Sequence, residues 1–227
     1  MSTRTLSPYA FVSQLPAATE ITFHNVSWEE YEELLEEVGE ASGLRISYDE
    51  GTLNVMTLSA KHEKYERFLE KLLGLVSVRL GINISSFGSA TMRKQKKRKG
   101  NEPDLCFYVQ TAGVIGNRIE LDFESDPPPD VAVEIDIHHD SRKKFSIYAG
   151  LEVPELWRFN GDALTIYLLE QDSYEETGVG RALPMLTPEV LTRFLAQLRD
   201  DGEFKTLIAF DEWLQSQRSY QSTRADL

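Results

Sequence analysis

The spacing of apolar and polar positions predicts alternating helices and strands along the chain. Apolar residues recur at helical spacing in five segments, at about 28–38, 60–80, 140 or 141 to 149, 188–198 and 204–217. Ser27-Trp28-Glu29-Glu30 has the spacing of a capping box at the start of the first segment, and Gly39 ends it. The chain therefore carries at least one long and several shorter amphipathic helices.

Strand patterns lie between these helices. Segments 44–48 and 53–56 flank a turn at 49–51, and segments 155–159 and 163–168 flank Asn160-Gly161-Asp162, so both pairs read as hairpins. Further strands are expected at 82–87 and 89–93. The sum predicts an α/β fold: a mixed β-sheet flanked by helices, with an N-terminal helix and hairpin. We expect one domain at 25–217, an N-terminal extension at 1–24 and a flexible C-terminal tail at 218–227.

Two strands carry acids where a buried strand should be apolar. They lie at 102–109 and 129–137. Side chains alternate between the two faces of a strand, so Asp104 in the first and Glu134 in the second lie opposite an apolar face. A buried carboxylate without a partner costs several kcal/mol. A hard divalent metal ion is a natural partner for such acids.

Length and composition limit the classes of protein. The chain has 227 residues, enough for one sizeable domain, and a net charge of −13, which argues against non-specific coating of nucleic acid. It shows no signal peptide and no run of the roughly 20 apolar residues that a membrane span needs. One cysteine, Cys106, fits the reducing cytoplasm and a packing role. We expect a cytoplasmic protein that does not contact a membrane.

A basic run interrupts this acidic average. Six cations fall within seven positions, and removing them from the net charge of −13 leaves −19 on the remaining chain; they are Arg93, Lys94, Lys96, Lys97, Arg98 and Lys99. The run ends five residues before Asp104, where it could bind the phosphates of DNA. A solvated hairpin turn explains the same charges without any ligand.

A lysine follows the second acidic strand on the short helix. Lys144 lies beside the apolar stripe that carries Phe145 and Tyr148, at the margin where it could turn towards the sheet. Two carboxylates, Mg²⁺ or Mn²⁺ and one lysine form a common apparatus for phosphodiester hydrolysis. The same three side chains could instead form an ion-pair network in a binding fold.

These residues resemble a known family. Pro103-Asp104, Val133-Glu134-Ile135, Lys144 and the segment 148–157 are similar to the Uma-type bacterial proteins described as "putative restriction endonucleases", within the PD-(D/E)XK nuclease superfamily. The resemblance covers about 25–170. It implies a restriction-endonuclease-like core, with Asp104, Glu134 and the backbone carbonyl of Ile135 as ligands of Mg²⁺ or Mn²⁺ and Lys144 as the catalytic lysine.

The chain departs from the superfamily pattern in two places near the second acid. Asp136 stands where the superfamily usually has lysine, and it could be a third acid facing the metal or a partner of Lys144. His138-His139-Asp140 replaces the usual turn. Adjacent residues rarely point at one ion, so we interpret this run as a solvated loop.

The early helix also departs from the family. Lys61-His62-Glu63 stands where the family has an acid and a histidine. Glu63 or Glu66 could supply the missing acid, although charged helix residues are ordinary at a surface. His62 could catalyse, but packing or hydrogen bonding is the more ordinary role for it.

The sequence thus predicts a metal-dependent endonuclease that hydrolyses DNA phosphodiester bonds through Mg²⁺-activated water. The resemblance implies products with a 5′-phosphate and a 3′-hydroxyl. DNA and a second copy of the chain are the expected partners, because cutting two strands with one site per chain usually requires a homodimer. The alternative is a catalytically inactive nuclease-fold module that binds DNA or protein, which the acidic charge and the altered segment at 136–140 favour.

Overall fold

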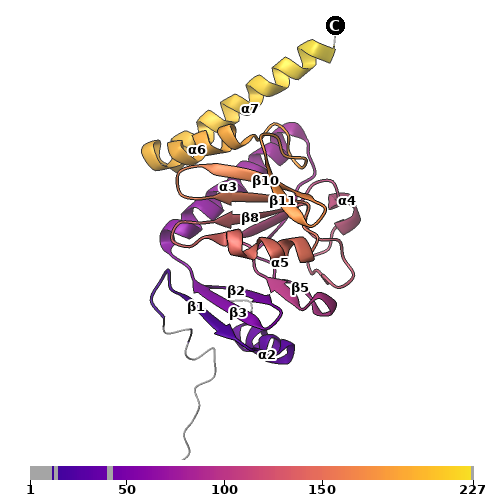
Figure 1. The fold of residues 1–227 in the computed structure, drawn as a ribbon. Helices are drawn as coiled ribbons and strands as arrows, with labels where there is room; N and C mark the ends of the chain where they lie inside the picture. Colours follow the sequence, from indigo (N-terminus) through magenta and orange to yellow (C-terminus); the bar gives the residue numbers. More distant parts are fainter. Residues whose placement is uncertain (1–11, 13–14, 40–42, 226–227) are drawn as a thin grey trace, which may run out of the picture.

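The computed structural model describes residues 12, 15–39 and 43–225, and side chains as far as Gln217, and it arranges them as two β-sheets with helices around them (Figure 1). The elements in chain order are β1 (Glu20–His24), α2 (Trp28–Val38), β2 (Leu44–Asp49), β3 (Thr52–Thr57), α3 (Ala60–Leu80), β4 (Ser85–Gly88), β5 (Met92–Lys94), η1 (Gln95–Lys97), β6 (Lys99–Asn101), β7 (Leu105–Tyr108), α4 (Ala112–Ile115), β8 (Val131–Ile135), η2 (Ser141–Lys144), α5 (Phe145–Gly150), β9 (Glu155–Phe159), β10 (Leu164–Glu170), β11 (Ser173–Thr177), α6 (Pro188–Asp201) and α7 (Glu203–Ala225).

The first sheet has the strand order β1-β3-β2-β6-β5, and every pair in it is antiparallel. The helix α2 covers it and buries Trp28, Tyr31 and Leu34 against its apolar face. The capping box at Ser27 and Glu30 is present, as the sequence predicted. A Cβ at Gly100 in β6 would lie 2.1 Å from the hydroxyl oxygen of Tyr31, so a side chain there would force α2 away from the sheet.

The second sheet has the order β11-β10-β9-β8-β7-β4. Only the pair β8 and β9 is parallel, and the crossover between them consists of η2 and α5. The helix α3 packs on one face of this sheet and shares its apolar core with α6 and α7, while α5 packs on the other face (Figure 1). The mixed α/β class is therefore confirmed, but the prediction of a single mixed sheet is wrong.

The strand predicted at 89–93 accounts for part of this difference. Its residues fall in and before β5, which pairs with β6 and therefore belongs to the first sheet. After β6 the chain passes through Glu102 into the second sheet. The predicted strand at 82–87 corresponds to β4 in the second sheet. The two hairpins, β2–β3 and β9–β10, are both confirmed.

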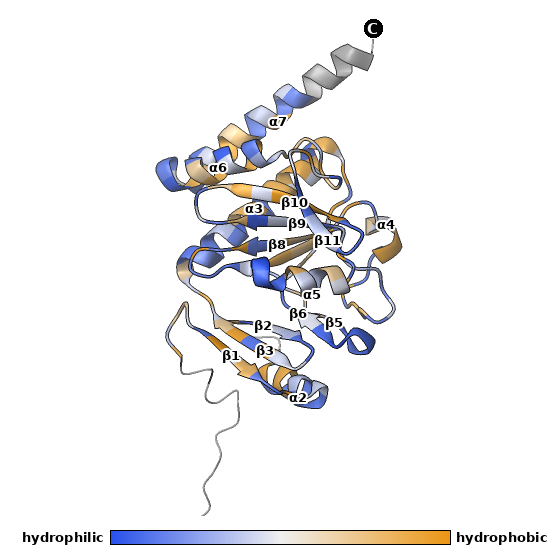
Figure 2. Cartoon of the chain, in the orientation of Figure 1, coloured by the Kyte–Doolittle hydropathy of each residue, from blue (hydrophilic) through white to orange (hydrophobic). Residues whose placement is uncertain are grey.

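The two faces of β7 and β8 separate apolar from polar side chains, as alternation predicted. Leu105, Val133 and Ile135 belong to the large apolar core beneath α3, together with Tyr65 and Leu69 from that helix. Figure 2 shows the hydrophilic turn between β5 and β6 in blue. One face of β8 is thus a conventional core, and the other is free to hold charged groups.

Both predicted end segments contain regular structure. The proposed extension at 1–24 includes β1, which pairs with β3 and was not indicated by the sequence. The prediction of a flexible tail from 218 is not matched by the backbone, because α7 continues to Ala225. Within the part of the chain that the structure describes, no helix combines the length and apolar character needed to cross a membrane.

Candidate active site

Asp104 and Glu134 lie on neighbouring strands, on the face opposite the apolar core. Asp104 immediately precedes β7, and its backbone N–H donates to the carbonyl of Val133 in β8 at 3.0 Å. Glu134 is the next residue of β8 and points to the other face. The two residues are 0% and 3% exposed. The carboxylate of Asp104 also accepts a hydrogen bond of 2.6 Å from the N–H of Ile135, which fixes it against β8.

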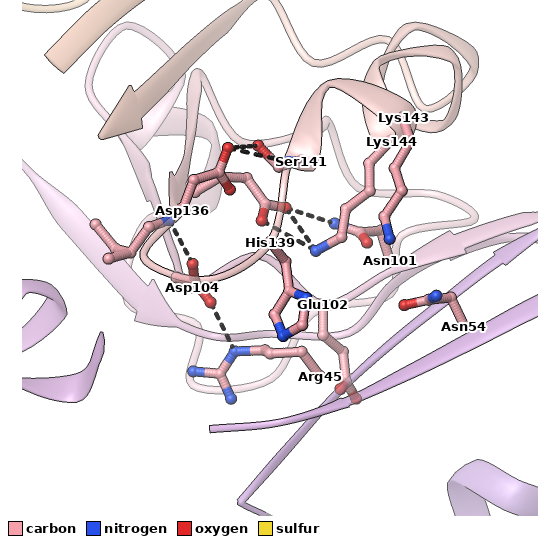
Figure 3. A network of polar contacts seen from close by, with 12 residues as sticks. Arg45, Asn54, Asn101, Glu102, Asp104, Asp136, His139, Ser141, Lys143 and Lys144 are labelled. Carbon is pink, nitrogen blue, oxygen red and sulfur yellow. Dashed lines mark hydrogen bonds and ion pairs between the residues drawn. The ribbon is translucent and has the colours of Figure 1, made fainter. Parts of the chain in front are cut away.

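Glu134 accepts hydrogen bonds from three other elements, and Figure 3 marks those from Lys144 and Asn101 with dashed lines. Nζ of Lys144 in η2 lies 3.1 Å from Oε1 and 3.0 Å from Oε2. The hydroxyl of Tyr148 in α5 and Nδ2 of Asn101 in β6 both donate to Oε1. Lys144 is only 7% exposed. Asp104, Glu134 and Lys144, which the sequence singled out, therefore meet in one buried network.

Burial and neighbouring charges shift the pKa values of Lys144 and Glu134. Burial alone would lower the pKa of Lys144, but the carboxylates of Glu134 and Asp104 outweigh it, so the pKa of Lys144 lies above its usual value. Burial raises the pKa of Glu134; Lys144 opposes this rise and Asp104 adds to it. Lys144 is therefore an ammonium group at neutral pH, able to donate hydrogen bonds and stabilise negative charge.

Asp104 lies among several partners. Nε2 of His62, near the start of α3, lies 2.9 Å from Oδ2. Burial raises the pKa of Asp104, but the contact with His62 and the charges of Lys144 and Arg45 bring it below its usual value. Asp104 is therefore an anion at neutral pH, and His62 lies within the site as predicted.

Arg45 is a member of the site that we did not predict. It lies on β2 of the first sheet and is 7% exposed. Its Nε donates to Oδ1 of Asp104 at 3.2 Å, and its Nη2 donates to Oε2 of Glu66 at 3.1 Å. The available signal was a charged residue between Leu44 and Ile46 in an apolar strand, the same signal that identified the acids.

The helical acid beside the site is Glu66, and the prediction of Glu63 is not supported. Glu63 is exposed, whereas Glu66 is 6% exposed and lies one turn after His62 on the same side of α3. The helix turns residues 62, 65, 66 and 69 inwards, so position 63 faces solvent. Glu66 was the alternative left open by the sequence.

Asp136 is engaged by other partners than those considered from the sequence. Its Oδ2 accepts from the N–H and the hydroxyl of Ser141, each at 3.0 Å, and Arg158 in β9 forms an ion pair with it. These contacts fix the turn between β8 and η2. The structure thus pairs Asp136 with Arg158 rather than with Lys144. The carbonyl of Ile135, the predicted backbone ligand, accepts from the N–H of Ile137 at 3.2 Å.

The His138-His139-Asp140 run joins the two sheets instead of forming only a solvated loop. His138 is exposed. His139 is partly buried, with Nδ1 3.0 Å from Oε2 of Glu20 in β1 and Nε2 3.1 Å from the carbonyl of Ala18. Lys143 forms a second ion pair with Glu20. This segment therefore ties the turn before Lys144 to the first sheet.

The basic run lies on β5, η1 and β6 and is partly neutralised within the chain. Arg93, Lys94 and Lys99 form ion pairs with acids of α2, the loop after α5, and the β2–β3 turn. Arg98 donates to the hydroxyl of Tyr48. Lys96 and Lys97 are exposed. The run is a hairpin turn, as the simpler interpretation proposed, and four of its cations, Arg93, Lys96, Lys97 and Arg98, are exposed to solvent.

The chemistry of the donors suits a hard divalent cation. Asp104 and Glu134 supply carboxylates, and the buried Oδ1 of Asn101 has no hydrogen-bond partner. Mg²⁺ and Mn²⁺ prefer carboxylate and amide oxygens. Among the described residues, however, no three His, Cys, Asp or Glu side chains are grouped closely enough to hold a metal ion, and Arg45 and Lys144 occupy the two carboxylates. A metal would therefore require these cations to shift.

Comparisons with known proteins show a family and a similar fold. A family model named Uma2, described as "Putative restriction endonuclease", matches residues 28–199. The chain is similar in structure to a protein from Anabaena variabilis ATCC 29413, described as a "putative nuclease belonging to DUF820", with a TM-score of 0.51 and 15% sequence identity over 75% of this chain and 99% of the other. At this identity the likeness shows the fold alone. No curated protein sequence matches the chain.

Proposed function

The chain belongs to the Uma2 family of restriction-endonuclease-like proteins, and from this we propose that it is a metal-dependent endonuclease that hydrolyses DNA phosphodiester bonds. The observation that carries the proposal is the buried contact of Lys144 with Glu134, beside Asp104 on the next strand. Two acids and a lysine on the inner face of a sheet are the arrangement that the PD-(D/E)XK pattern implies. We accordingly propose a restriction-endonuclease-like core within a single domain at 25–217.

Asp104 and Glu134 would hold Mg²⁺ or Mn²⁺, with the amide oxygen of Asn101 and the carbonyl of Ile135 as further oxygen donors. Such an ion, when bound, polarises the phosphate and lowers the pKa of a coordinated water. We assign no direct role to Glu63, because it is exposed, and a positioning role to His62 beside Asp104. Asp136 would support the turn before Lys144 through Ser141.

Lys144 would stabilise the transition state rather than act as a base. Because its pKa is raised by Glu134 and Asp104, it is protonated and can only donate. Its ammonium group would orient the attacking water and neutralise charge that develops on the phosphate. Water forms the new P–O bond and loses a proton, while the bond to the 3′ oxygen breaks and that oxygen gains a proton. The products are a 5′-phosphate and a 3′-hydroxyl.

We propose that the hairpin turn at 93–99 guides the DNA backbone. Arg93, Lys96, Lys97 and Arg98 are its exposed cations, and of these Lys96 and Lys97 form the centre of the turn; phosphate contacts by such cations make binding strongly dependent on salt. A homodimer would supply the second site needed to cut both strands. The buried single cysteine, Cys106, suits a protein of the reducing cytoplasm.

The second candidate is an inactive nuclease-fold module that binds DNA or protein. It is favoured by the saturation of the ionic network, because the carboxylates of Asp104 and Glu134 already have cations from the chain. Such a network could serve stability alone. The two functions differ in one property, since only the nuclease requires a metal ion at these acids.

A plasmid-nicking assay tests the proposed function. Supercoiled plasmid is incubated with the wild type, Asp104→Asn, Glu134→Gln and Lys144→Gln in Mg²⁺, in Mn²⁺ and with chelator. We expect each variant and the chelator to reduce nicking by about 100-fold or more. Asp211→Asn, on the distant helix α7, is the matched control and should nick like the wild type. Equal nicking by the wild type and the Glu134→Gln variant would exclude this site as the source of activity.

A further inference from the structure

Arg45 brings a buried positive charge to the acids of the site. It bridges Asp104 at 3.2 Å and Glu66 at 3.1 Å, and the side chains of all three residues are at most 8% exposed. Its Nη1 donates to the carbonyl of Leu44 at 3.1 Å, which anchors the guanidinium to its own strand. The side chain therefore connects the first sheet, the second sheet and α3.

Arg45 balances negative charge between two buried acids of this region. Lys144 pairs with Glu134 and, like His62, also acts on Asp104, whereas Arg45 bridges Asp104 to Glu66. Without the positive charge of Arg45 between them, Asp104 and Glu66 would be two buried carboxylates near each other, which is strongly destabilising. A divalent cation at Asp104 would meet the same electrostatic requirement. Either Arg45 or a metal ion could therefore balance the negative charge of the Asp104 carboxylate.

The surroundings of Arg45 provide room for it to leave Asp104. Arg45 lines a cavity of about 520 Å³ between the first sheet and the loop at 119–123. The walls of this cavity include two further acids, Glu102 and Glu120. A guanidinium that turned away from Asp104 would thus enter a space lined by the exposed Glu120 and by Glu102, which already accepts hydrogen bonds from the N–H of Ile46 and the hydroxyl of Thr91.

We propose that Arg45 is a resident counter-cation that holds the acids of the site while metal is absent and is displaced towards this cavity when metal binds. The proposal rests on the proposed function, since it concerns the metal of the same site. It makes Arg45 a positioning residue that sets metal affinity. Because Arg45 lies on β2, the first sheet would also influence how tightly the site binds metal.

The test compares Arg45→Met with the wild type by Mn²⁺ titration in a calorimeter, and by thermal unfolding with chelator and with saturating Mn²⁺. We expect Mn²⁺ to bind about tenfold more tightly to Arg45→Met, because the ion no longer competes with the arginine. The variant should unfold at a lower temperature in chelator and recover most of the loss with Mn²⁺. Lys71→Met is the matched control, since Lys71 also pairs with an acid but lies on α3 outside the site, and it should change neither the affinity nor the gain on adding Mn²⁺.

Arg45→Lys keeps the test decisive should Arg45→Met fail to fold. Lysine retains one charge but cannot bridge Asp104 and Glu66 with two donors, so we expect an affinity between those of the wild type and Arg45→Met. Unchanged or weaker Mn²⁺ binding by the arginine variants, with normal binding by the wild type, would overturn the role of Arg45 and leave the nuclease proposal intact. Absence of Mn²⁺ binding by every variant and by the wild type would overturn both.

Discussion

The two faces of β8 are both buried, yet they are stabilised in different ways. Val131, Val133 and Ile135 face α3 within the large apolar core. Glu134, on the opposite face, meets donors that arrive from η2, α5 and β6. The apolar face gains stability in proportion to the area removed from water, whichever side chains supply it. The ionic face is stable only while each charge keeps its particular partner.

This difference explains where function is expected. Apolar packing tolerates exchanges of similar volume, so it places few demands on individual residues. The ionic face keeps four charged side chains, namely Asp104, Glu134, Lys144 and Arg45, in a small buried volume. Such an arrangement is a weak way to gain stability, and binding of a metal ion and a phosphate is the function that we propose for it.

Removal of a charge from the ionic face should have the largest effect. Lys144→Met leaves Glu134 buried without its cation and should lower the free energy of unfolding by about 3–5 kcal/mol. Urea unfolding followed by circular dichroism measures the change. Combining Lys144→Met with Glu134→Gln removes both charges and should recover most of the loss. If the single and double variants were equally unstable, the ionic face would be stabilised by packing, like the opposite face.

A cavity on the apolar face should have a smaller effect, and metal should not correct it. Val133→Ala removes two methyl groups from the core and should lower the free energy of unfolding by about 1–3 kcal/mol. The same urea experiment with and without Mn²⁺ should give the same loss, because Val133 points away from the acids. A loss that Mn²⁺ abolished would show that the two faces are not independent.

Exposed charges in the basic turn should affect DNA binding and leave stability nearly unchanged. Replacing Lys96 and Lys97 by alanine should reduce the salt dependence of DNA binding, with the slope of log affinity against log salt falling by about 1.8. The free energy of unfolding should stay within about 0.5 kcal/mol. Lys64→Ala/Lys71→Ala, on α3, is a control of equal charge. An equal loss of slope in the control would remove the special role of the turn.

An exposed ion pair near the site should show the smallest effect. Arg142 lowers the pKa of Asp140 to about 2, below its usual 3.8. A depressed pKa of an acid adds stability above pH 4, and this is lost as the pH falls towards 2. Because Asp140 is largely exposed, Asp140→Asn should cost only about 0.5 kcal/mol at pH 7 and nothing near pH 2. Urea unfolding at both pH values measures this, and a larger loss at pH 2 would contradict the assignment.

Local pattern predicted the elements better than it predicted their partners. The capping box located α2, and alternation placed Asp104 and Glu134 on the polar face, because both signals lie within a few residues. Helical spacing placed Lys144 beside the apolar stripe of Phe145 and Tyr148, and the family resemblance gave it the catalytic role. Arg45 was missed because its partner Asp104 is 59 residues away, and their contact depends on how the first sheet packs against the second.

The same limit applies to the arrangement of the sheets. β1 is short and only partly buried, so its sequence gives a weak strand signal, and its pairing with β3 depends on the hairpin beside it. The division of neighbouring segments between two sheets, β4 in one and β5 in the other, is likewise set by long-range pairing. The sequence of one strand alone therefore says little about which strand it pairs with.

Calorimetric titration of Mn²⁺ into the wild type and into Asp104→Asn/Glu134→Gln shows whether the ionic face of β8 holds a metal ion, as we propose. We expect one site per chain in the wild type and loss of that site in the double variant, with both proteins folded by circular dichroism. Mn²⁺ binding that survives in the double variant, or is absent from the wild type, would contradict this proposal.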